Sequence, residues 1–416
     1  MSDVVLTTAA GSRGSFAGDV SRPALAGWTV AFAVAVAHGV NDLYSAFLQP
    51  LLPRIMAELD LSITLAASLT TALALGASLL QPFMGAAADR YGARRFVIAG
   101  PLISAVFLSL IGVADSFLAL VVLLAIGGLG SAMFHPPATS LAAGAGAGGR
   151  AGARMSVFSF GGALGYAVGP LAAVALVGSL GLGGLAWAML PALLLVPLLL
   201  RAVPPVPGHA RPSRGLEGMI ETLGSLRGAL GLLFVISTTA AFVQRVFVTL
   251  QPIAIAAGGG SEALGATTLS TYLGAQALGS VAGGLLTDRF DRRRLLLWLV
   301  VASLPAHWLA LALTPGQPLT LLVTAIAGLL NMALLPPLVI MAREASPHGA
   351  ATSAGIIMGL AWAAGSIVMI GAGALADVLG ARSAAMLCTP VLLLAGLAAL
   401  QPALGPYARA RTGRAP

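Results

Sequence analysis

Gly85-Ala-Ala-Ala-Asp89-Arg90-Tyr-Gly92-Ala-Arg94-Arg95 occurs a second time, about 200 residues later, as Gly284-Leu-Leu-Thr-Asp288-Arg289-Phe-Asp291-Arg-Arg293-Arg294. Three further matches follow in the same order and at nearly the same shift: Leu48-Gln49-Pro50 with Leu250-Gln251-Pro252, Pro136-Pro137 with Pro336-Pro337, and Gly165 with Gly365. Ordered matches at one shift indicate internal repetition. The sequence therefore predicts a tandem duplication of two halves.

The composition places these halves in a membrane. Of the 416 residues, 58% are hydrophobic and only 9% are charged, whereas a soluble domain carries roughly 25% charged residues. A helix needs about 20 apolar residues to cross a ~30 Å hydrocarbon core. Twelve runs fit: 27–52, 62–88, 95–114, 117–141, 152–178, 183–201, 226–257, 265–287, 294–314, 318–345, 350–376 and 382–402. We predict an all-α integral membrane protein with twelve transmembrane helices in two six-helix bundles.

The segments outside the runs give the domain boundaries. We expect six-helix bundles over 27–201 and 226–402, with a disordered cytoplasmic tail over 1–26 and a cytoplasmic tail over 403–416. Residues 202–225 contain four prolines and several polar positions, which is typical of a linker. The first 26 residues have no short apolar core before a cleavage site. The first helix is therefore expected to serve as its own insertion signal.

The basic residues predict the orientation. The net charge is +8 and all 22 basic residues are arginine. With the N-terminus inside, 19 arginines fall on cytoplasmic segments, which leaves Arg54 and Arg382 outside and Arg245 within a helix. Cytoplasmic loops of membrane proteins carry such an excess of positive charge. We expect a multi-pass protein of the bacterial inner membrane with both termini cytoplasmic, and no nucleic-acid partner.

Several chemical motifs are missing from the sequence. Cys388 is the single cysteine, so an intramolecular disulfide or a cysteine-based metal site cannot form. No Gly-x-x-x-x-Gly-Lys, His-Glu-x-x-His, Cys-x-x-Cys or Gly-x-Ser-x-Gly occurs. We therefore expect neither an enzyme nor an ATP-driven pump, and no metal or cofactor.

The first helix carries one polar stripe. His38, Asp42, Ser45 and Gln49 are spaced by four, three and four residues and share a helix face, with Asn41 beside them. An ionisable group in a membrane helix costs at least about 2.5–3.5 kcal/mol, so this face must line a water-filled cavity or meet a partner. A hydrogen-bond cluster that locks the helix to a neighbour is the structural alternative. We predict that Asp42, assisted by His38, carries the coupling proton, since few other acidic residues lie inside the membrane.

The repeat extends the predicted cavity to the second half. Gln244 and Gln251 correspond to Asp42 and Gln49. Arg245 interrupts a long apolar run, so it either binds an anionic substrate group through its planar fork or pairs with a neighbouring helix. We assign to the substrate cavity Asn41, Tyr44, Ser45, Gln49, His135, Gln244, Arg245, Gln251 and Asn331.

His135 has a second interpretation. It lies one helical turn from Ser131 and beside two prolines, which are expected to bend the helix. It could therefore bind carbonyls that the bend sets free. Its counterpart in the second half is Leu335, so the histidine is peculiar to the first half.

The duplicated loop is expected to gate the cavity. Its acidic and basic residues can form charge networks at cytoplasmic helix ends that hold the halves together in one state and separate in the other. Gly92 suits a tight turn after the helix. The predicted gating residues are Gly85, Asp89, Arg90, Gly92, Arg94, Asp288 and Arg289.

These motifs resemble those of the major facilitator superfamily. The segment from Gly85 to Arg95 is similar to its loop motif Gly-x-x-x-Asp-Arg-x-Gly-x-Arg-Arg/Lys, and the second copy departs from it at Asp291. Three segments resemble the fosmidomycin-resistance efflux branch: His38-Gly-Val-Asn41-Asp42-Leu-Tyr44, Ser78-Leu-Leu-Gln81-Pro82 and Gly130-Ser131-Ala-Met-Phe134-His135-Pro136. Pro137 stands where members of that branch carry a glutamate.

The fifth run contains another resemblance. Gly165-Tyr-Ala-Val-Gly169-Pro170 is similar to the core of a helix signature of proton-coupled antiporters, although Ala173 and Val174 replace the glycine pair that follows there. A close-packing Gly-x-x-x-Gly face gives the same spacing.

The resemblance implies secondary active transport by alternating access. We expect a monomer in the lipid bilayer that exports a small polar or anionic compound, such as a fosmidomycin-like drug, in exchange for protons. Uptake of a small metabolite by proton symport is the alternative. A membrane receptor that binds a solute without transporting it is a more remote one.

Overall fold

The computed structural model describes residues 21–144, 150–205, 224, 226–345 and 355–409. These residues form helices and no strands, which confirms the predicted all-α class. The helices of the first half are α1 (Ser21–Ser45), α2 (Leu48–Leu59), α3 (Ile63–Leu79), α4 (Gln81–Tyr91), α5 (Ala93–Ser109), α6 (Phe117–Gly144), α7 (Ala151–Leu180) and α8 (Leu190–Ala202). Short 3-10 helices, η1 (Leu110–Val113) and η2 (Leu182–Met189), follow α5 and precede α8.

The second half repeats this order. Its helices are α10 (Gly228–Ala257), α11 (Glu262–Arg289), α12 (Arg292–Ala312), α13 (Pro318–Ala333), α14 (Leu335–Ala345), α16 (Ala361–Leu379), α17 (Ala381–Cys388) and α18 (Leu392–Ala399). The shorter helices are η3 (Gly355–Leu360), which is a π-helical turn, η4 (Thr389–Val391) and η5 (Pro402–Tyr407).

Joined across their breaks, the described helices give twelve spans. Ten are long and apolar enough to cross a membrane, and the pair α3 and α4, bent by 40°, makes an eleventh. The twelfth is α11, whose 28 residues are sufficient in length, but which contains many glycines, serines and threonines. The predicted two bundles of six therefore agree with the structure.

The boundaries differ slightly from those expected. The first helix begins at Ser21, so residues 21–26 are helical, while the rest of the predicted N-terminal tail lies outside the described residues. Most of the predicted linker 202–225 also lies outside them. In the predicted C-terminal tail, residues up to Tyr407 belong to η5, and residues 410–416 are not described.

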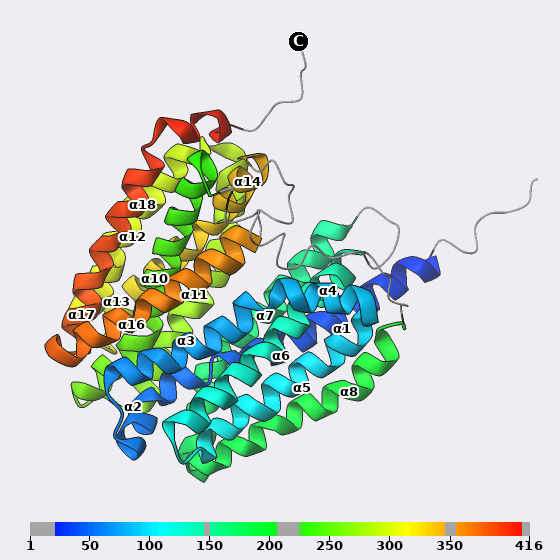
Figure 1. Ribbon diagram of the computed structural model, residues 1–416, viewed down its shortest axis with the longest axis horizontal. Coiled ribbons are helices and arrows are strands. Elements are labelled where there is room, and N and C mark those ends of the chain that lie inside the picture. The colour runs from blue at the N-terminus through cyan, green and yellow to red at the C-terminus, as the bar shows by residue number, and fades with distance from the viewer. Residues whose placement is uncertain (1–20, 145–149, 206–223, 225, 346–354, 410–416) are drawn as a thin grey trace, which may run out of the picture.

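Each half is a separate bundle, and the two meet at one end (Figure 1). We term the helix ends that carry Asp89 and Asp288 the motif side, and the ends near Arg54, Glu262 and Asp377 the far side. The bundles lie together where α3 meets α16 and α2 meets α10 and α11, and they diverge toward α4 and α14 (Figure 1). Two equivalent helix pairs, α3 with α16 and α7 with α11, form the main contacts between the halves.

Glycines bring α1 and α7 into close contact. A Cβ atom on Gly165 would overlap the carbonyl of Gly39, and one on Gly161 would overlap the carbonyl of Ala35. Gly169 packs in the same way against the carbonyl of Leu43. Small residues at spacing four let helix backbones approach in membranes. This contact supports the packing interpretation of the Gly165 to Gly169 segment.

Arginines of the loop motifs cap helices within their own half. Arg94 donates to the carbonyl of Leu200 at the end of α8, and its repeat counterpart Arg293 donates to the carbonyls of Ala399 and Leu400 at the end of α18. The last carbonyls of a helix lack intrahelical partners, so a cation there is favourable. These arginines thus fix equivalent helices in both bundles.

The one departure in the second motif has a structural reason. Gly92 joins α4 to α5 with a φ of 96°, a conformation that favours glycine. Asp291 has a φ of −60° and caps α12, because its side chain accepts a hydrogen bond from the backbone N–H of Arg294 at 3.0 Å. The turn predicted at Gly92 is confirmed. In the second half, a side-chain cap by Asp291 takes the place of the glycine turn.

Candidate transport site

The carboxylate of Asp42 is shared by two imidazoles. Its Oδ2 lies 3.1 Å from Nε2 of His38, one turn earlier in α1, and its Oδ1 lies 3.3 Å from Nε2 of His135 in α6. Asn41 donates to Oδ1 of Asp42 at 3.0 Å and to Oγ of Ser131 at 3.2 Å. The structure thus joins His135, which we expected in the substrate cavity, to the predicted proton carrier.

Backbone carbonyls fix both imidazoles in one tautomer. Nδ1 of His38 lies 2.8 Å from the carbonyl oxygen of Phe158, and Nδ1 of His135 lies 2.8 Å from that of Ser131. A carbonyl oxygen only accepts hydrogen bonds, so each Nδ1 carries the hydrogen. Both Nε2 atoms that face Asp42 are then acceptors when the rings are neutral.

This tautomer assignment gives the cluster a defined proton capacity. An ionised carboxylate is also only an acceptor, so each contact with Asp42 needs one proton to become a hydrogen bond. With one added proton the cluster of two imidazoles and a carboxylate is neutral, and with two its charge is +1. The cluster is partly open, because the side chains of Asp42 and His135 keep 19% and 25% of their surface accessible.

Helix α7 forms the wall behind the cluster. The His38 ring stacks on Phe158, with ring centroids 4.1 Å apart. A Cβ atom on Gly162 would overlap that same ring, so glycine makes room for the imidazole. The close approach of α1 and α7 therefore determines where His38 points, and Phe158 is a site residue that the sequence did not indicate.

The same three side chains could also bridge a divalent cation. One ligand atom from each of His38, Asp42 and His135 lies within 4.8 Å of the other two. The imidazole and carboxylate atoms are, however, already at hydrogen-bond distance from one another.

The second half has an amide network in the corresponding place. Gln244 donates to Oε1 of Gln276 at 3.1 Å, and Gln276 donates to Oδ1 of Asn331 at 3.3 Å. Asn331 in turn donates to the carbonyl of Ala240 at 3.1 Å. These residues join α10, α11 and α13, and all three amides are buried. None of these three side chains is titratable, but Gln276 also bonds the hydroxyl of Tyr272, which lies 2.9 Å from Nε2 of His307.

Arg245 lies beside this network without a carboxylate partner among the described residues. Its guanidinium is 5.9 Å from the ring centroid of Trp362 in α16, and its Nε atom is buried without a hydrogen-bond acceptor. Trp362 is one turn from Ser366, whose carbonyl accepts a hydrogen bond from Thr71 of the first half at 2.7 Å. Residues four apart share a helix face, so Trp362 lies on the face of α16 that meets the other half.

Of four other predicted cavity residues, three are buried in the helix packing and Ser45 is half-buried. Tyr44 is buried and donates to the carbonyl of Ala188 at 2.6 Å, while Ser45 bonds the carbonyl of Asn41 in its own helix at 3.4 Å. Gln49 and Gln251 are also buried, and Nε2 of Gln49 has no partner. A role in substrate binding stays a prediction for these four.

The gating residues of the two motifs make few polar contacts. Within the described ranges, no ion pair involves Asp89, Asp288 or Arg289. The guanidinium of Arg90 lies 5.4 Å from the ring centroid of Tyr91. Gly85 faces Pro136, which a Cβ atom would approach to 3.3 Å, so α4 and α6 pack closely. The predicted charge network between the halves is not formed among the described residues in this conformation.

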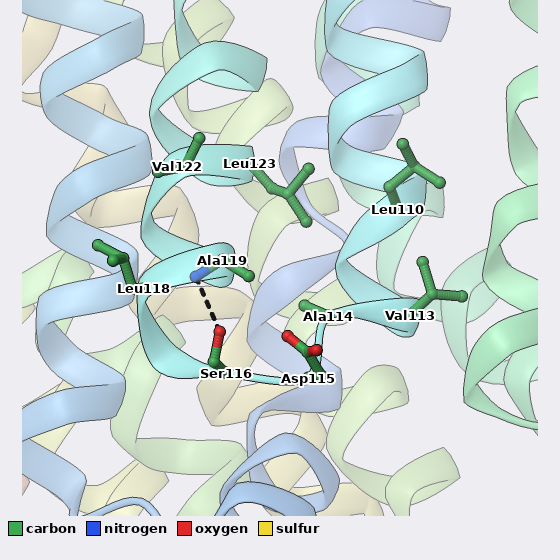
Figure 2. Close-up of a pocket in the computed structure, with 9 residues that line it drawn as sticks. All are labelled: Leu110, Val113, Ala114, Asp115, Ser116, Leu118, Ala119, Val122 and Leu123. Carbon is green, nitrogen blue, oxygen red and sulfur yellow. Dashed lines mark hydrogen bonds between the residues drawn. The ribbon is translucent and has the colours of Figure 1, made fainter.

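One hollow of about 570 Å³ lies elsewhere (Figure 2). It is formed by the hairpin between α5 and α6 at the far side, with Asp115 and Ser116 at the turn and leucine, valine and alanine side chains around it. The hydrogen bond drawn there caps α6 locally, from the Ala119 N–H to Oγ of Ser116 at 3.3 Å. This hollow involves neither the Asp42 cluster nor Arg245.

Comparison with known proteins identifies relatives over most of the chain. The chain is 26% identical to the fosmidomycin resistance protein of Escherichia coli (strain K12) over 359 residues, which cover 83% of this chain and 86% of that protein. It is also 26% identical to the uncharacterized MFS-type transporter YfnC of Bacillus subtilis (strain 168) over 372 residues, 87% of this chain and 90% of that one.

Solved structures share the fold. A bacterial homologue of the human lysosomal transporter Spinster, in an inward-facing and unoccupied conformation, superposes with a TM-score of 0.77 at 18% identity, covering 95% of this chain and 100% of that one. A point mutant of the nucleoside transporter NupG gives 0.76 at 13% identity, covering 89% and 99%.

The family model extends over both halves. The model of the Major Facilitator Superfamily matches residues 34–250 and again residues 230–415. Together with the duplicated loop motif and the twelve described spans, this match settles the family. The chain is a transporter that belongs to the major facilitator superfamily.

Proposed function

We propose that the protein exports a small anionic compound across the bacterial inner membrane in exchange for protons. His38, Asp42 and His135 hold the protons, and Arg245 binds the anionic group of the substrate. The observation that carries this proposal is the placement of Asp42 between two imidazoles whose other nitrogens are bound to carbonyls. Such a cluster can gain and lose protons at the carboxylate and the Nε2 atoms while the hydrogen bonds from the Nδ1 atoms to the carbonyls stay in place.

The proposal assigns the motif side to the cytoplasm, as the arginine distribution predicts. The described conformation is then open inward, because the hydrogen bonds and ion pairs between the described parts of the halves lie toward the far side. In the opposite state the motif loops approach each other, and Asp89, Asp288 and the neighbouring arginines form the charge network. Protons from outside reach Asp42 in that state and leave it in the inward-open one.

Arg245 supports the choice of an anion. A guanidinium inside the membrane without a carboxylate partner is costly, and an anionic ligand removes that cost by occupying its planar fork. The similarity to a protein named for fosmidomycin resistance supports a fosmidomycin-like compound as the first candidate. Gln244, next to Arg245, positions its helix by bonding Gln276.

Exchange requires proton and substrate to exclude each other. In the proposed cycle the substrate donates a hydrogen bond to Asp42, which needs a carboxylate that is free of protons. Acidification therefore weakens substrate binding. If the proton and the anion instead assist each other's binding, the low dielectric of the site favours their uptake together, and the protein is a symporter.

The direction of coupling can be tested in inside-out membrane vesicles. A susceptibility screen of cells that express the protein, with fosmidomycin as the first compound of a phosphonate panel, identifies the probe. Antiport predicts that the labelled probe accumulates when the vesicle interior is made acid and does not accumulate when the exterior is acid. The reverse result indicates symport, and binding without accumulation indicates a receptor.

A further inference from the structure

Two polar contacts join the halves at the far side. Arg54, in α2, donates from Nε to Oε1 of Glu262 at 2.7 Å and from Nη2 to Oε2 at 3.0 Å. Both oxygens and two guanidinium nitrogens take part, which is the bidentate geometry that makes arginine and carboxylate pairs specific. Glu262 is the first residue of α11, where the helix dipole also favours a carboxylate.

The second contact is a helix cap supplied by the other half. Oδ1 of Asp377, near the end of α16, accepts from the backbone N–H of Ile63 at 2.6 Å. Oδ2 accepts from the N–H of Thr64 at 3.1 Å and from its hydroxyl at 2.5 Å. Ile63 begins α3. The first N–H groups of a helix have no intrahelical acceptors, so α3 depends on α16 for two of them.

Close packing brings these groups together. A Cβ atom on Gly373, one turn before Asp377, would lie 2.7 Å from Cβ of Ala67 and 3.0 Å from the carbonyl oxygen of Ile63. The glycine therefore lets α16 lie directly on α3. Across the described residues, the hydrogen bonds and ion pairs identified between the halves involve residues 54–71 of the first half and residue 262 or residues 366–377 of the second.

We infer that these contacts form a far-side lock, defined as the Arg54–Glu262 ion pair and the Asp377 cap on Ile63 and Thr64. The lock holds the far side closed and sets the balance between the two open states. This inference rests on the proposed alternating access but not on proton coupling. When the far side opens, α2 and α3 must leave α11 and α16, and both contacts are then lost together.

The lock can be tested without a substrate. Spin labels at Ala57→Cys and Gln317→Cys, two exposed far-side positions in different halves, report the separation of the halves in a Cys388→Ala background. Double electron–electron resonance in lipid nanodiscs then gives the distance distribution. Glu262→Gln and Asp377→Asn are each expected to increase the population with the longer distance.

A charge exchange separates the lock from simple loss of stability. Arg54→Glu alone should open the far side, and Arg54→Glu combined with Glu262→Arg should restore the distribution of the parent. Glu344→Gln is the matched control, because Glu344 bonds Arg292 at 2.8 Å within the second half, and it should leave the far-side distance unchanged.

Two results would overturn the lock. One is an unchanged distance distribution in both Glu262→Gln and Asp377→Asn, and the other is an exchanged pair that behaves like Arg54→Glu alone. The labels report separation of the halves and not flux, so a failed lock leaves the proton site standing. Failure of the Asp42 site in a flux assay likewise leaves the lock intact.

Discussion

Asp42 and Gln244 are equivalent residues of the duplicated halves, yet Asp42 contacts two imidazoles whereas Gln244 bonds the amide of Gln276. The repeat has thus placed a carboxylate between two imidazoles in one bundle and a chain of amides at the corresponding place in the other. A proton is therefore expected to act on the first half, while the second half offers amides and Arg245.

Asp42→Asn is expected to remain folded and inserted but to lose proton-driven transport, because an amide cannot release a proton. The measurement is probe flux in vesicles under an imposed pH gradient. Asp115→Asn, which removes a carboxylate at the hairpin turn of Figure 2, is the control and should transport normally. Normal gradient-driven flux in Asp42→Asn would exclude this residue as the coupling group.

Substrate affinity is expected to rise from about pH 5 to about pH 8, the range in which histidines and perturbed carboxylates commonly titrate. The sign follows from competition: below this range the cluster keeps its protons and Asp42 cannot accept from the substrate. His135→Gln removes one of the two protonation sites and should make the dependence shallower. The check is probe binding to purified protein, and affinity that rises on acidification would contradict antiport.

Arg245→Gln is expected to weaken binding of an anionic probe roughly 10- to 100-fold, since a hydrogen bond to a charged group contributes about 1.5–3 kcal/mol. A neutral analogue of the probe should bind nearly as before. Arg245→Lys keeps the charge without the planar fork, so its affinity for the anionic probe should lie between those of the parent and of Arg245→Gln. Equal losses for anionic and neutral probes would assign Arg245 a structural role instead.

Gly165→Ala is expected to destabilise the protein by about 1–3 kcal/mol, the usual cost of overpacking, because the new methyl group would overlap the Gly39 carbonyl. Thermal unfolding in detergent, followed by tryptophan fluorescence, measures the effect. Gly178→Ala lies in the same helix, where a Cβ atom meets nothing within 4 Å, and should be neutral or slightly stabilising. Equal stability of both variants would rule out the packing role.

Much of the fold could be predicted from apolar length and repetition. The twelve runs follow from the thickness of the bilayer, and the shift near 200 residues identifies the halves. The helix ends differ from the apolar run over 27–52, since α1 begins at Ser21 and α2 continues to Leu59. Hydropathy does not register caps or helix breaks.

The site was predictable only within one helix. Helical spacing places His38 and Asp42 on one face, but the approach of His135 depends on how α6 packs against α1. Phe158 and Trp362 act through contacts between helices, for which the sequence carried no signal beyond their aromatic character. For Gln276 the sequence did give a signal, because it is a polar residue within an apolar run.

The dependence of α3 on Asp377 also gives the protein a built-in reporter of its state. While the far side is closed, the amide hydrogens of Ile63 and Thr64 are held by a carboxylate of the other half. Once the halves part, this acceptor is lost and both amides are free to exchange with water. Deuterium uptake by these two amides then counts openings of the unlabelled, unmodified transporter, and a bound substrate changes the rate of that uptake by as much as it changes the fraction of open molecules.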